Sequence, residues 1–447
     1  MAGEWKKGRL SGLCEQIADC PHSTPLWTDS GELVLRSQNI RSGHLDLSAK
    51  SYTDDAHFEQ RSRRAWLRGG DVVITREAPM GEVCLISDGL RCCLGQRMVM
   101  LRPDPKKCDS RFLLYSIQSR AVQNEIKVNE GTGSTVSNLR IPLLEALPIP
   151  HPPLAEQKAI AAVLGALDDK IELNQRTNAT LEAMARALFQ CWFVDFDPVR
   201  AKLCGRKLID LDAATAALFP AQFQDSPIGP VPKGWKVERF DAHITADRGL
   251  SYKGEGLRDD QSGLPMHNLN SVYEGGGYKH EGLKYYEGEY REKHLLHPGD
   301  MIVTNAEQGF DHLLIGHAAI VPRCYGPKRI YSHHIYRVRH KPSSPFSPHY
   351  LVELFNNRRW HCWISGFSNG TTINMLPMDA LEIPMLVVPP VELVKTFTAL
   401  AEAAHLQVED NKQQSRTLAT LRDTLLPKLL SGELSVEELN HNRVAMP

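Results

Sequence analysis

Two long segments of the chain carry apolar residues at alternating intervals of four and three. The first begins directly after Pro152-Pro153, and its seam reads Ile160, Leu164, Leu167, Ile171, Asn174, Asn178, Leu181, Ala185, Leu188 and Trp192. This spacing is a heptad repeat, typical of a helix that packs against another helix along a narrow stripe. Because proline is tolerated in the first turn of a helix and opposes continuation from upstream, we predict a central helix over residues 154–195.

The same pattern returns after Pro389-Pro390. Adding 237 to each position of the first seam gives Phe397, Ala401, Ala404, Val408, Asn411, Ser415, Leu418, Arg422, Leu425 and Leu429. This seam is less apolar, yet it predicts a second helix over residues 391–430. Each helix of roughly 39 residues would be ~58 Å long at ~1.5 Å per residue. That length indicates a spacer, and two ordinary core helices are the alternative interpretation.

Short apolar runs broken by Gly, Pro and Asp fill most of the remaining chain. Residues 71–75 and 97–101 are examples, and such runs are typical of strands. They occupy residues 1–153 and 233–390, and we predict an α+β domain in each. A linker over 196–232 and a tail over 431–447 complete this division.

The two predicted domains are copies of one another. Residues 70–75 (GDVVIT) recur 229 positions later as 299–304 (GDMIVT), and residues 133–136 (GSTV) recur 237 positions later as 370–373 (GTTI). Trp5-Lys6 likewise recurs as Trp235-Lys236. The chain is therefore predicted to be a tandem duplication of a domain followed by a long helix.

Composition narrows the class of protein. The 447 residues carry 52 basic and 53 acidic side chains, a net charge of -1, which argues against a nonspecific polycation. Residues 1–153 sum to +2 and residues 233–390 to +1. No apolar run approaches the ~20 residues that cross a bilayer, so we expect no membrane association. Ten cysteines without a C-x-x-C pair and an amino terminus without an apolar signal segment favour a reduced, cytoplasmic chain.

Several motifs resemble the specificity subunits of Type I restriction–modification systems. They are residues 188–202 (LFQCWFVDFDPVRAK), 225–235 (DSPIGPVPKGW), 152–157 (PPLAEQ) and 425–433 (LLPKLLSGE). The second copy departs from PPLAEQ, with PPVELV at 389–394. The resemblance implies two duplicated α/β target-recognition domains separated by two long antiparallel coiled-coil helices, with pseudo-twofold symmetry.

The resemblance also implies a non-catalytic, DNA-binding subunit. Its expected partners are double-stranded DNA, two methyltransferase subunits and restriction subunits, which would supply S-adenosylmethionine, ATP and Mg²⁺ chemistry. The residues agree, because Pro152-Pro153 and Pro389-Pro390 lack the Asn, Asp or Ser before them and the aromatic residue after them that adenine methylation needs. No phosphate-binding Gly-x-x-x-x-Gly-Lys-Ser/Thr loop and no zinc-type ligand spacing occurs in the sequence, so we predict neither a catalytic residue nor a metal ligand.

Polar side chains on loops that recur in both domains are candidates for reading bases in the DNA grooves. The predicted DNA-binding residues are Gln38, Asn39, Arg41, Arg76, Gln96, Arg97, Gly133, Ser134 and Thr135, with His267, Asn268, Asn270, Asn305, His333, His334, Asn369, Thr371 and Thr372 in the second copy. Local turn hydrogen bonds are the competing explanation for each one. It applies most to Asn39 and Asn268, which are identical in both copies. A coiled-coil scaffold that binds proteins and not DNA is the alternative function.

The helix seams also predict a register. Asn174 and Asn178 flank the midpoint of the first seam, and Asn411 and Ser415 flank that of the second. In an antiparallel pair these residues would meet as Asn174 with Ser415 and Asn178 with Asn411. Such buried polar pairs fix register, because any slip sets amides against apolar side chains. The competing interpretation is a polar break that faces solvent or a partner.

Overall fold

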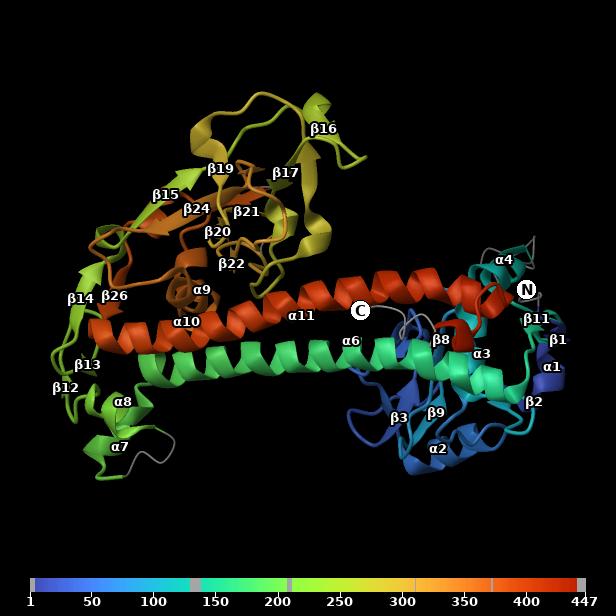
Figure 1. The fold of residues 1–447 in the computed structure, drawn as a ribbon. Coiled ribbons are helices and arrows are strands. Elements are labelled where there is room, and N and C mark those ends of the chain that lie inside the picture. Colours follow the sequence, from blue (N-terminus) through green and yellow to red (C-terminus); the bar gives the residue numbers. More distant parts are fainter. Residues whose placement is uncertain (1–4, 129–137, 207–210, 310, 371–372, 440–447) are drawn as a thin grey trace. The chain divides into compact units, whose positions relative to one another are not determined.

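The computed structural model describes residues 5–128, 138–206, 211–309, 311–370 and 373–439. The chain divides into two compact units. Figure 1 shows the fold as a ribbon coloured by residue number. Unit 1 comprises Met1–Asn174 and Gln413–Pro447, and unit 2 comprises Gln175–Lys412. Each unit therefore contains one predicted domain together with parts of both long helices. No helix among the described residues is both long and apolar enough to cross a membrane.

Unit 1 is built on a four-stranded antiparallel sheet with the order β2-β10-β7-β8. The strands are β2 Cys14–Asp19, β10 Met98–Pro103, β7 Val72–Thr75 and β8 Val83–Leu85. A second sheet has the order β6-β3-β9, in which β3 and β9 are parallel. Its strands are β6 Tyr52–Thr53, β3 Glu32–Leu35 and β9 Cys92–Leu94, while β1 Lys7–Arg9 pairs with β11 Pro148–Pro150 and β4 Ile40–Arg41 pairs with β5 His44–Leu45. The short helices are α1 Leu10–Leu13, α2 Asp55–Ser62, α3 Ser110–Gln118, α4 Arg120–Val128 and α5 Ile141–Glu145.

Unit 2 repeats the four-stranded sheet, and its second sheet has five strands where that of unit 1 has three. Its four-stranded antiparallel sheet has the order β15-β24-β20-β22, formed by Ile244–Arg248, Ile335–His340, Met301–Thr304 and Ala318–Ile320. Its second sheet has the order β16-β18-β17-β23-β19, formed by Leu257–Arg258, Lys284–Tyr286, Leu264–His267, Arg329–Tyr331 and Leu295–Leu296, with β17 and β23 parallel. The paired strands are β14 Lys236–Arg239 with β26 Met385–Val388, β21 Ala306–Gln308 with β25 Ile373–Met375, and β12 Phe223–Gln224 with β13 Val231–Pro232. The short helices are α7 Asp197–Leu203, α8 Ala213–Ala217, α9 Pro348–Asn356 and α10 Arg358–Ser365. The duplication predicted from the sequence is thus present in the fold.

The central strand of each four-stranded sheet explains why these residues adopt the same fold twice. Every residue of β7 and of β20 is buried. The glycine that opens each run, Gly70 or Gly299, has a positive φ of 86° or 87°, which a side chain would strain. The following aspartate is held by an arginine fork: Arg102 donates to Asp71 at 2.8 and 2.7 Å, and Arg339 donates to Asp300 at 2.8 and 2.6 Å. Sheet, turn and ion pair therefore recur together.

The long helices are α6, Leu154–Phe189, and α11, Val391–Ser431. Both begin directly after the double prolines, as predicted. The α-helical part of α6 ends six residues earlier than residue 195, because Gln190–Val194 forms a π-helical turn closed by the Asp195 N–H bond to Gln190 O at 2.8 Å. Phe189, Trp192 and Phe193, in and beside this turn, belong to one buried aromatic cluster of unit 2. The exact domain boundaries at residues 153 and 390 stay predictions.

The long helices run antiparallel within each unit and lie side by side in Figure 1. In unit 1 the buried seam residues Ile160 and Leu164 share a core cluster with Leu429. In unit 2 the Phe189 and Phe397 rings lie 5.6 Å apart. The seam predicted from the sequence is therefore a buried helix–helix interface in both units.

Candidate nucleic-acid interface

The two identical asparagines hold turns. Asn39 is buried; its Oδ1 accepts the Arg36 N–H, and its Nδ2 donates to Asp46 O and Ala49 O, each at 2.9 Å. The buried Asn268 does the same work in unit 2, donating to Gly282 O at 2.7 Å and accepting the Asn270 N–H at 2.9 Å. The polar atoms of both side chains are engaged by backbone, which favours the turn explanation. Their neighbours Gln38, Arg41 and Asn270 are exposed.

The residues at the strand exits are also engaged inside the fold. Arg76 donates to Asp19 Oδ2 at 2.8 Å, to Leu139 O at 2.9 Å and to Asn138 Oδ1 at 3.1 Å. Asn305, its counterpart by the offset of 229, is fully buried and donates to His333 O at 3.0 Å. Both side chains tie the strand exit to a neighbouring loop and leave little of themselves for a ligand.

His267 is placed in the interior as well. Its ring is 0% exposed, and its Nδ1 lies 2.9 Å from the Tyr278 hydroxyl. Burial lowers the pKa of His267 to about 3, so the ring is neutral in the folded protein. A base edge or a phosphate has no access to it.

The fourth pair of loops is at least partly exposed. Gln96 donates to His22 O at 2.8 Å, and Arg97 lies beside Glu77 at 3.1 Å with 51% of its side chain exposed. In unit 2 the half-buried rings of His333 and His334 lie 3.9 Å apart, and burial lowers the pKa of His334. Asn369 is exposed, and its backbone N–H and carbonyl form hydrogen bonds with the backbone of Met375. Gly133, Ser134, Thr135, Thr371 and Thr372 lie outside the described residues.

A basic groove in unit 1 was missed from the sequence. It has a volume of about 380 Å³ and is lined by the exposed Arg63 and Arg64, by His22 and His57, and by segment 21–25. No ion pair engages Arg63 or Arg64 among the residues that the structure describes. The signal was the run Arg61-Ser62-Arg63-Arg64 at the end of α2, and the fold brings it beside the loop that carries Gln96.

The polar residues of the seam form two hydrogen-bonded groups. In unit 1, Asn174 Nδ2 lies 3.2 Å from Ser415 Oγ and 2.9 Å from Gln414 Oε1. In unit 2, Asn411 Nδ2 donates to Asn178 Oδ1 at 2.8 Å. These are the two pairs that the seam register predicts. Asn174, Asn178 and Asn411 are between 2 and 7% exposed, so the polar break faces the opposing helix and not solvent.

Comparison with known proteins identifies the family. The model of the Type I restriction modification DNA specificity domain matches residues 3–183. The Type I restriction enzyme HindI specificity subunit of Haemophilus influenzae is 31% identical over 420 residues, covering 82% of this chain and 87% of that protein. The MjaIX specificity subunit of Methanocaldococcus jannaschii is 25% identical over 383 residues, covering 83% and 79%.

The fold agrees with these relatives. The crystal structure of a Type-I restriction-modification system S subunit from M. genitalium matches with a TM-score of 0.56 at 16% identity, covering 95% of this chain and 96% of that one. The duplicated sheets, the paired long helices and the similarity to the HindI subunit over most of both chains lead to one conclusion. The chain belongs to the specificity subunits of Type I restriction–modification systems.

Proposed function

We propose that this chain is the DNA-reading subunit of a Type I complex, in which each domain reads one half of a bipartite, asymmetric target. The observation that carries the proposal is the pattern of divergence between the two copies. Framework residues such as the Asp71–Arg102 and Asp300–Arg339 forks are the same in both units. The exposed loop positions differ, as two readers of different half-sites require.

The structure narrows the set of candidate contacts. We assign framework roles to Asn39, Arg76, His267, Asn268 and Asn305, because their polar atoms are buried or engaged within the fold. The exposed or half-exposed candidates remain: Gln38, Arg41, Gln96 and Arg97 in unit 1, and Asn270, His333, His334 and Asn369 in unit 2. We add Arg63 and Arg64 as phosphate contacts, which position the domain without reading sequence.

The long helices have a separate role in this proposal. They set the distance between the two readers, and thereby the length of the nonspecific spacer in the target. They also hold two methyltransferase subunits, which with the restriction subunits carry the chemistry and its S-adenosylmethionine, ATP and Mg²⁺. The chain itself then neither methylates nor cuts DNA. The polar pairs Asn174 with Ser415 and Asn178 with Asn411 favour a single register of the two helices. A fixed register supports a spacer of constant length.

An exchange of domains tests the proposal. Residues 1–153 are replaced by the first domain of another specificity subunit, the chain is assembled with its methyltransferase subunits, and the methylated sites are sequenced. We expect one half of the target to change while the other half and the spacer stay. A reciprocal exchange of residues 233–390 is the matched control and changes only the opposite half. A change in both halves, or in neither, contradicts two independent readers, and the absence of DNA binding by the assembled complex favours the protein-binding scaffold.

A further inference from the structure

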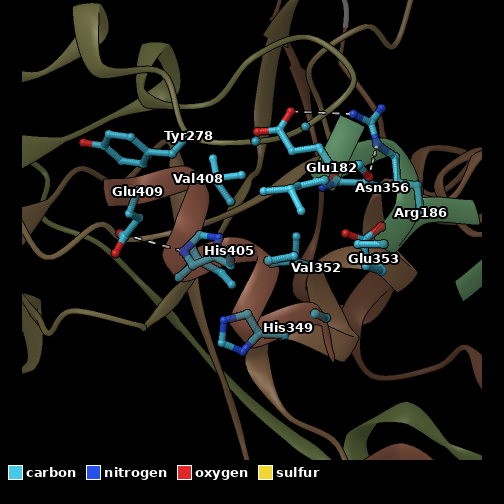
Figure 2. A pocket seen from close by; sticks show the side chains of 18 of the residues that line it. Glu182, Arg186, Tyr278, His349, Val352, Glu353, Asn356, His405, Val408 and Glu409 are labelled. Atoms are coloured by element: carbon cyan, nitrogen blue, oxygen red, sulfur yellow. Dashed lines mark hydrogen bonds and ion pairs between the residues drawn. The ribbon is translucent and has the colours of Figure 1, made fainter. Parts of the chain in front are cut away.

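Unit 2 contains a cavity of about 200 Å³ between α6, α9, α11 and the segment 273–280. Figure 2 shows Glu182 and Arg186 entering it from α6, His349 and Glu353 from α9, and His405 and Glu409 from α11. Its walls are largely small or apolar, with Ala185, Ala401 and Val408 on the two long helices. None of these residues belongs to the proposed DNA interface.

The internal repeat shows what occupies the same place in unit 1. The offset of 237 that takes Leu154, the first residue of α6, to Val391, the first of α11, also takes Asp168 to His405 and Ala185 to Arg422. Helices α3 and α9 have nine residues each, and their N-caps, Asp109 and Ser347, differ by 238. That offset takes Tyr115 to Glu353 and Arg111 to His349. Four residues that line the cavity, Ala185, His349, Glu353 and His405, therefore have counterparts in unit 1.

In unit 1 three of these counterparts, Tyr115, Asp168 and Arg422, form one hydrogen-bonded group. The Tyr115 hydroxyl donates to Asp168 Oδ2 at 2.6 Å, and Arg422 Nη1 donates to Asp168 Oδ1 at 2.7 Å. Arg111 makes its own ion pair with Asp169. The guanidinium of Arg422 is thus held by a carboxylate that is 8% exposed, with a helix of the domain on one side and the helix seam on the other. The carboxylate of Asp168 thus balances the charge of Arg422 and accepts hydrogen bonds from both Arg422 and Tyr115.

In unit 2 the cation is missing and the acceptors remain. Ala185 stands where unit 1 has Arg422, and Glu353 supplies the carboxylate that Asp168 supplies in unit 1. Among the described residues Glu353 makes neither a hydrogen bond nor an ion pair within bonding distance. The two cations at the rim are both directed at Glu182, Arg186 at 3.9 Å and Lys412 at 3.5 Å.

The pKa values of Glu353, His349 and His405 also favour a site that accepts hydrogen bonds. Burial raises the pKa of Glu353 to about 7, even though Arg186 lowers it. Burial lowers the pKa of His405 to about 4 and also lowers that of His349, so both rings are neutral near pH 7. A neutral imidazole offers a lone pair, and an ionised Glu353 offers two oxygens. Glu182 and Glu409 have cationic partners, whereas among the described residues no donor pairs with Glu353, which lies in the same cavity as the neutral rings of His349 and His405.

We propose that this cavity is a binding site for a guanidinium group, which occupies in unit 2 the place that the Arg422 side chain fills in unit 1. The ligand is either a free guanidinium compound or the arginine side chain of another subunit, and Glu353 is the residue that pairs with its charge. The site is independent of DNA reading, so the two proposals stand or fall separately.

The experiment titrates ethylguanidinium with the full chain near pH 7.5 and measures binding of this probe by ligand-observed NMR. We expect saturable binding in the millimolar range, as suits a ligand of few atoms. Ethylurea, which has a similar shape and no charge, should bind at least about tenfold more weakly. Saturable binding of both probes with equal affinity, or of neither, overturns the proposal.

Two variants locate the site. Glu353→Gln should weaken ethylguanidinium at least about tenfold, because the paired charge is lost. Ala185→Arg should abolish binding by restoring the arrangement of unit 1 within the chain, whereas Ala187→Arg, on an exposed position of the same helix, should leave it unchanged. Binding that survives Ala185→Arg places the probe elsewhere and contradicts the proposal. So does a Glu353→Gln variant that folds normally and binds as the parent does.

Unit 1 provides the calibration. Arg422→Ala should open the corresponding site around Asp168 and lower the melting temperature, and ethylguanidinium but not ethylurea should restore part of that loss. The source of the natural ligand follows from repeating the titration with the methyltransferase subunits bound. Loss of probe binding in the complex identifies an arginine of a partner subunit, and retained binding identifies a free guanidinium compound.

Discussion

Arg61 is a buried cation that organises the basic groove of unit 1. It is 4% exposed and donates to four backbone carbonyls, those of Pro21, Ser23, Leu94 and Gly95, at 2.8 to 3.3 Å. These bonds fix the segment that lines the groove against the turn that carries Gln96. Arg63 and Arg64 follow on the same helix end and remain exposed. Arg61 therefore holds the groove together from inside, and Arg63 and Arg64 are exposed for the phosphate contacts that we propose.

The double substitution Arg63→Ala, Arg64→Ala should weaken DNA binding by the assembled complex to a similar extent on every sequence. Each phosphate contact contributes about 0.9 to the dependence of affinity on salt, so the slope should fall by roughly two. Fluorescence anisotropy over a salt series measures it. Lys106→Ala, another exposed cation of unit 1, is the control and should change nothing. A loss confined to one target sequence would mean that these arginines read bases.

At the residue scale, identity between the copies was the useful signal. Asn39 and Asn268 were predicted to bind DNA, yet their identity in both copies already favoured the competing turn explanation, and their hydrogen bonds to backbone agree with that explanation. The burial of His267 had no such signal, since it depends on Tyr278, which reaches it through tertiary packing. Arg76 and Asn305 were selected for donor chemistry, and the fold uses that chemistry internally. Sequence reveals which side chains can donate, and packing decides to whom.

At the scale of elements, the seam of the long helices is held by amides that depend on one another. Asn178→Leu alone removes the hydrogen bond that Asn411 Nδ2 donates to Asn178 Oδ1 at a buried position, which should cost about 1–3 kcal/mol. The double variant Asn178→Leu, Asn411→Leu removes both partners and should recover most of that stability. Chemical denaturation of the three chains measures it.

The same double variant should relax the spacing of the target, because leucines accept more than one register. Sequencing of methylated sites would then reveal spacers of more than one length. A double variant with an unchanged spacer and full stability would show that other contacts, such as the Arg422 pair with Asp168, set the register.

The pH dependence of unit 2 should report on Glu353 of helix α9. Its pKa of about 7 in the folded chain exceeds the usual glutamate value of 4.5, so its contribution to stability is complete below pH 4.5 and is lost as the pH rises through 7. Relative to Glu353→Gln, the parent chain should lose on the order of 1–2 kcal/mol between pH 5 and 7.5. Groups that line the same cavity also titrate or carry charge: Glu182, Arg186, His349, His405, Glu409 and Lys412.

The comparison with Glu353→Gln separates this effect from the histidines. The pKa values of His349 and His405 are lowered by burial, so they stabilise the fold above pH 6.5 and less as the pH falls, the opposite direction. Their contribution is common to both chains and cancels in the difference. Parallel stability curves for the two chains would mean that Glu353 ionises normally.

The scale of the whole molecule is where the sequence was most informative. A constant offset between two sets of short motifs predicted the duplication, and the four-stranded sheets of the two units have corresponding strand orders. The double prolines located the starts of both long helices. The π-helical turn at Gln190–Val194 was not predictable, because the heptad spacing runs through Leu188 and Trp192 without a break. The duplication is therefore visible in the sequence, whereas this local departure from α-helical geometry has no signal in the heptad pattern.

The near balance of 52 basic and 53 acidic residues also acts at this scale. With few surplus cations, the isolated chain should bind duplex DNA weakly and with a shallow dependence on salt. Titration of fluorescent duplex with the chain alone, and then with its methyltransferase subunits, measures both. We expect the partners to raise the affinity and steepen the slope. Tight specific binding by the isolated chain at physiological salt would contradict this prediction.

Unit 1 is assembled from two distant stretches of the chain. The Trp5 indole N–H donates to Leu429 O at 2.9 Å, and Leu429, Leu430 and Val436 belong to the same core cluster as Leu10. A ribosome delivers residues 1–174 first, yet their core stays open until residues 413–439 have followed, while the contiguous unit 2 is already whole. The half that is translated first is therefore finished last. A chain that ends before residue 413 lacks Leu429, Leu430 and Val436 of this core, so we expect proteases to cleave its unit 1 more readily than that of the full chain.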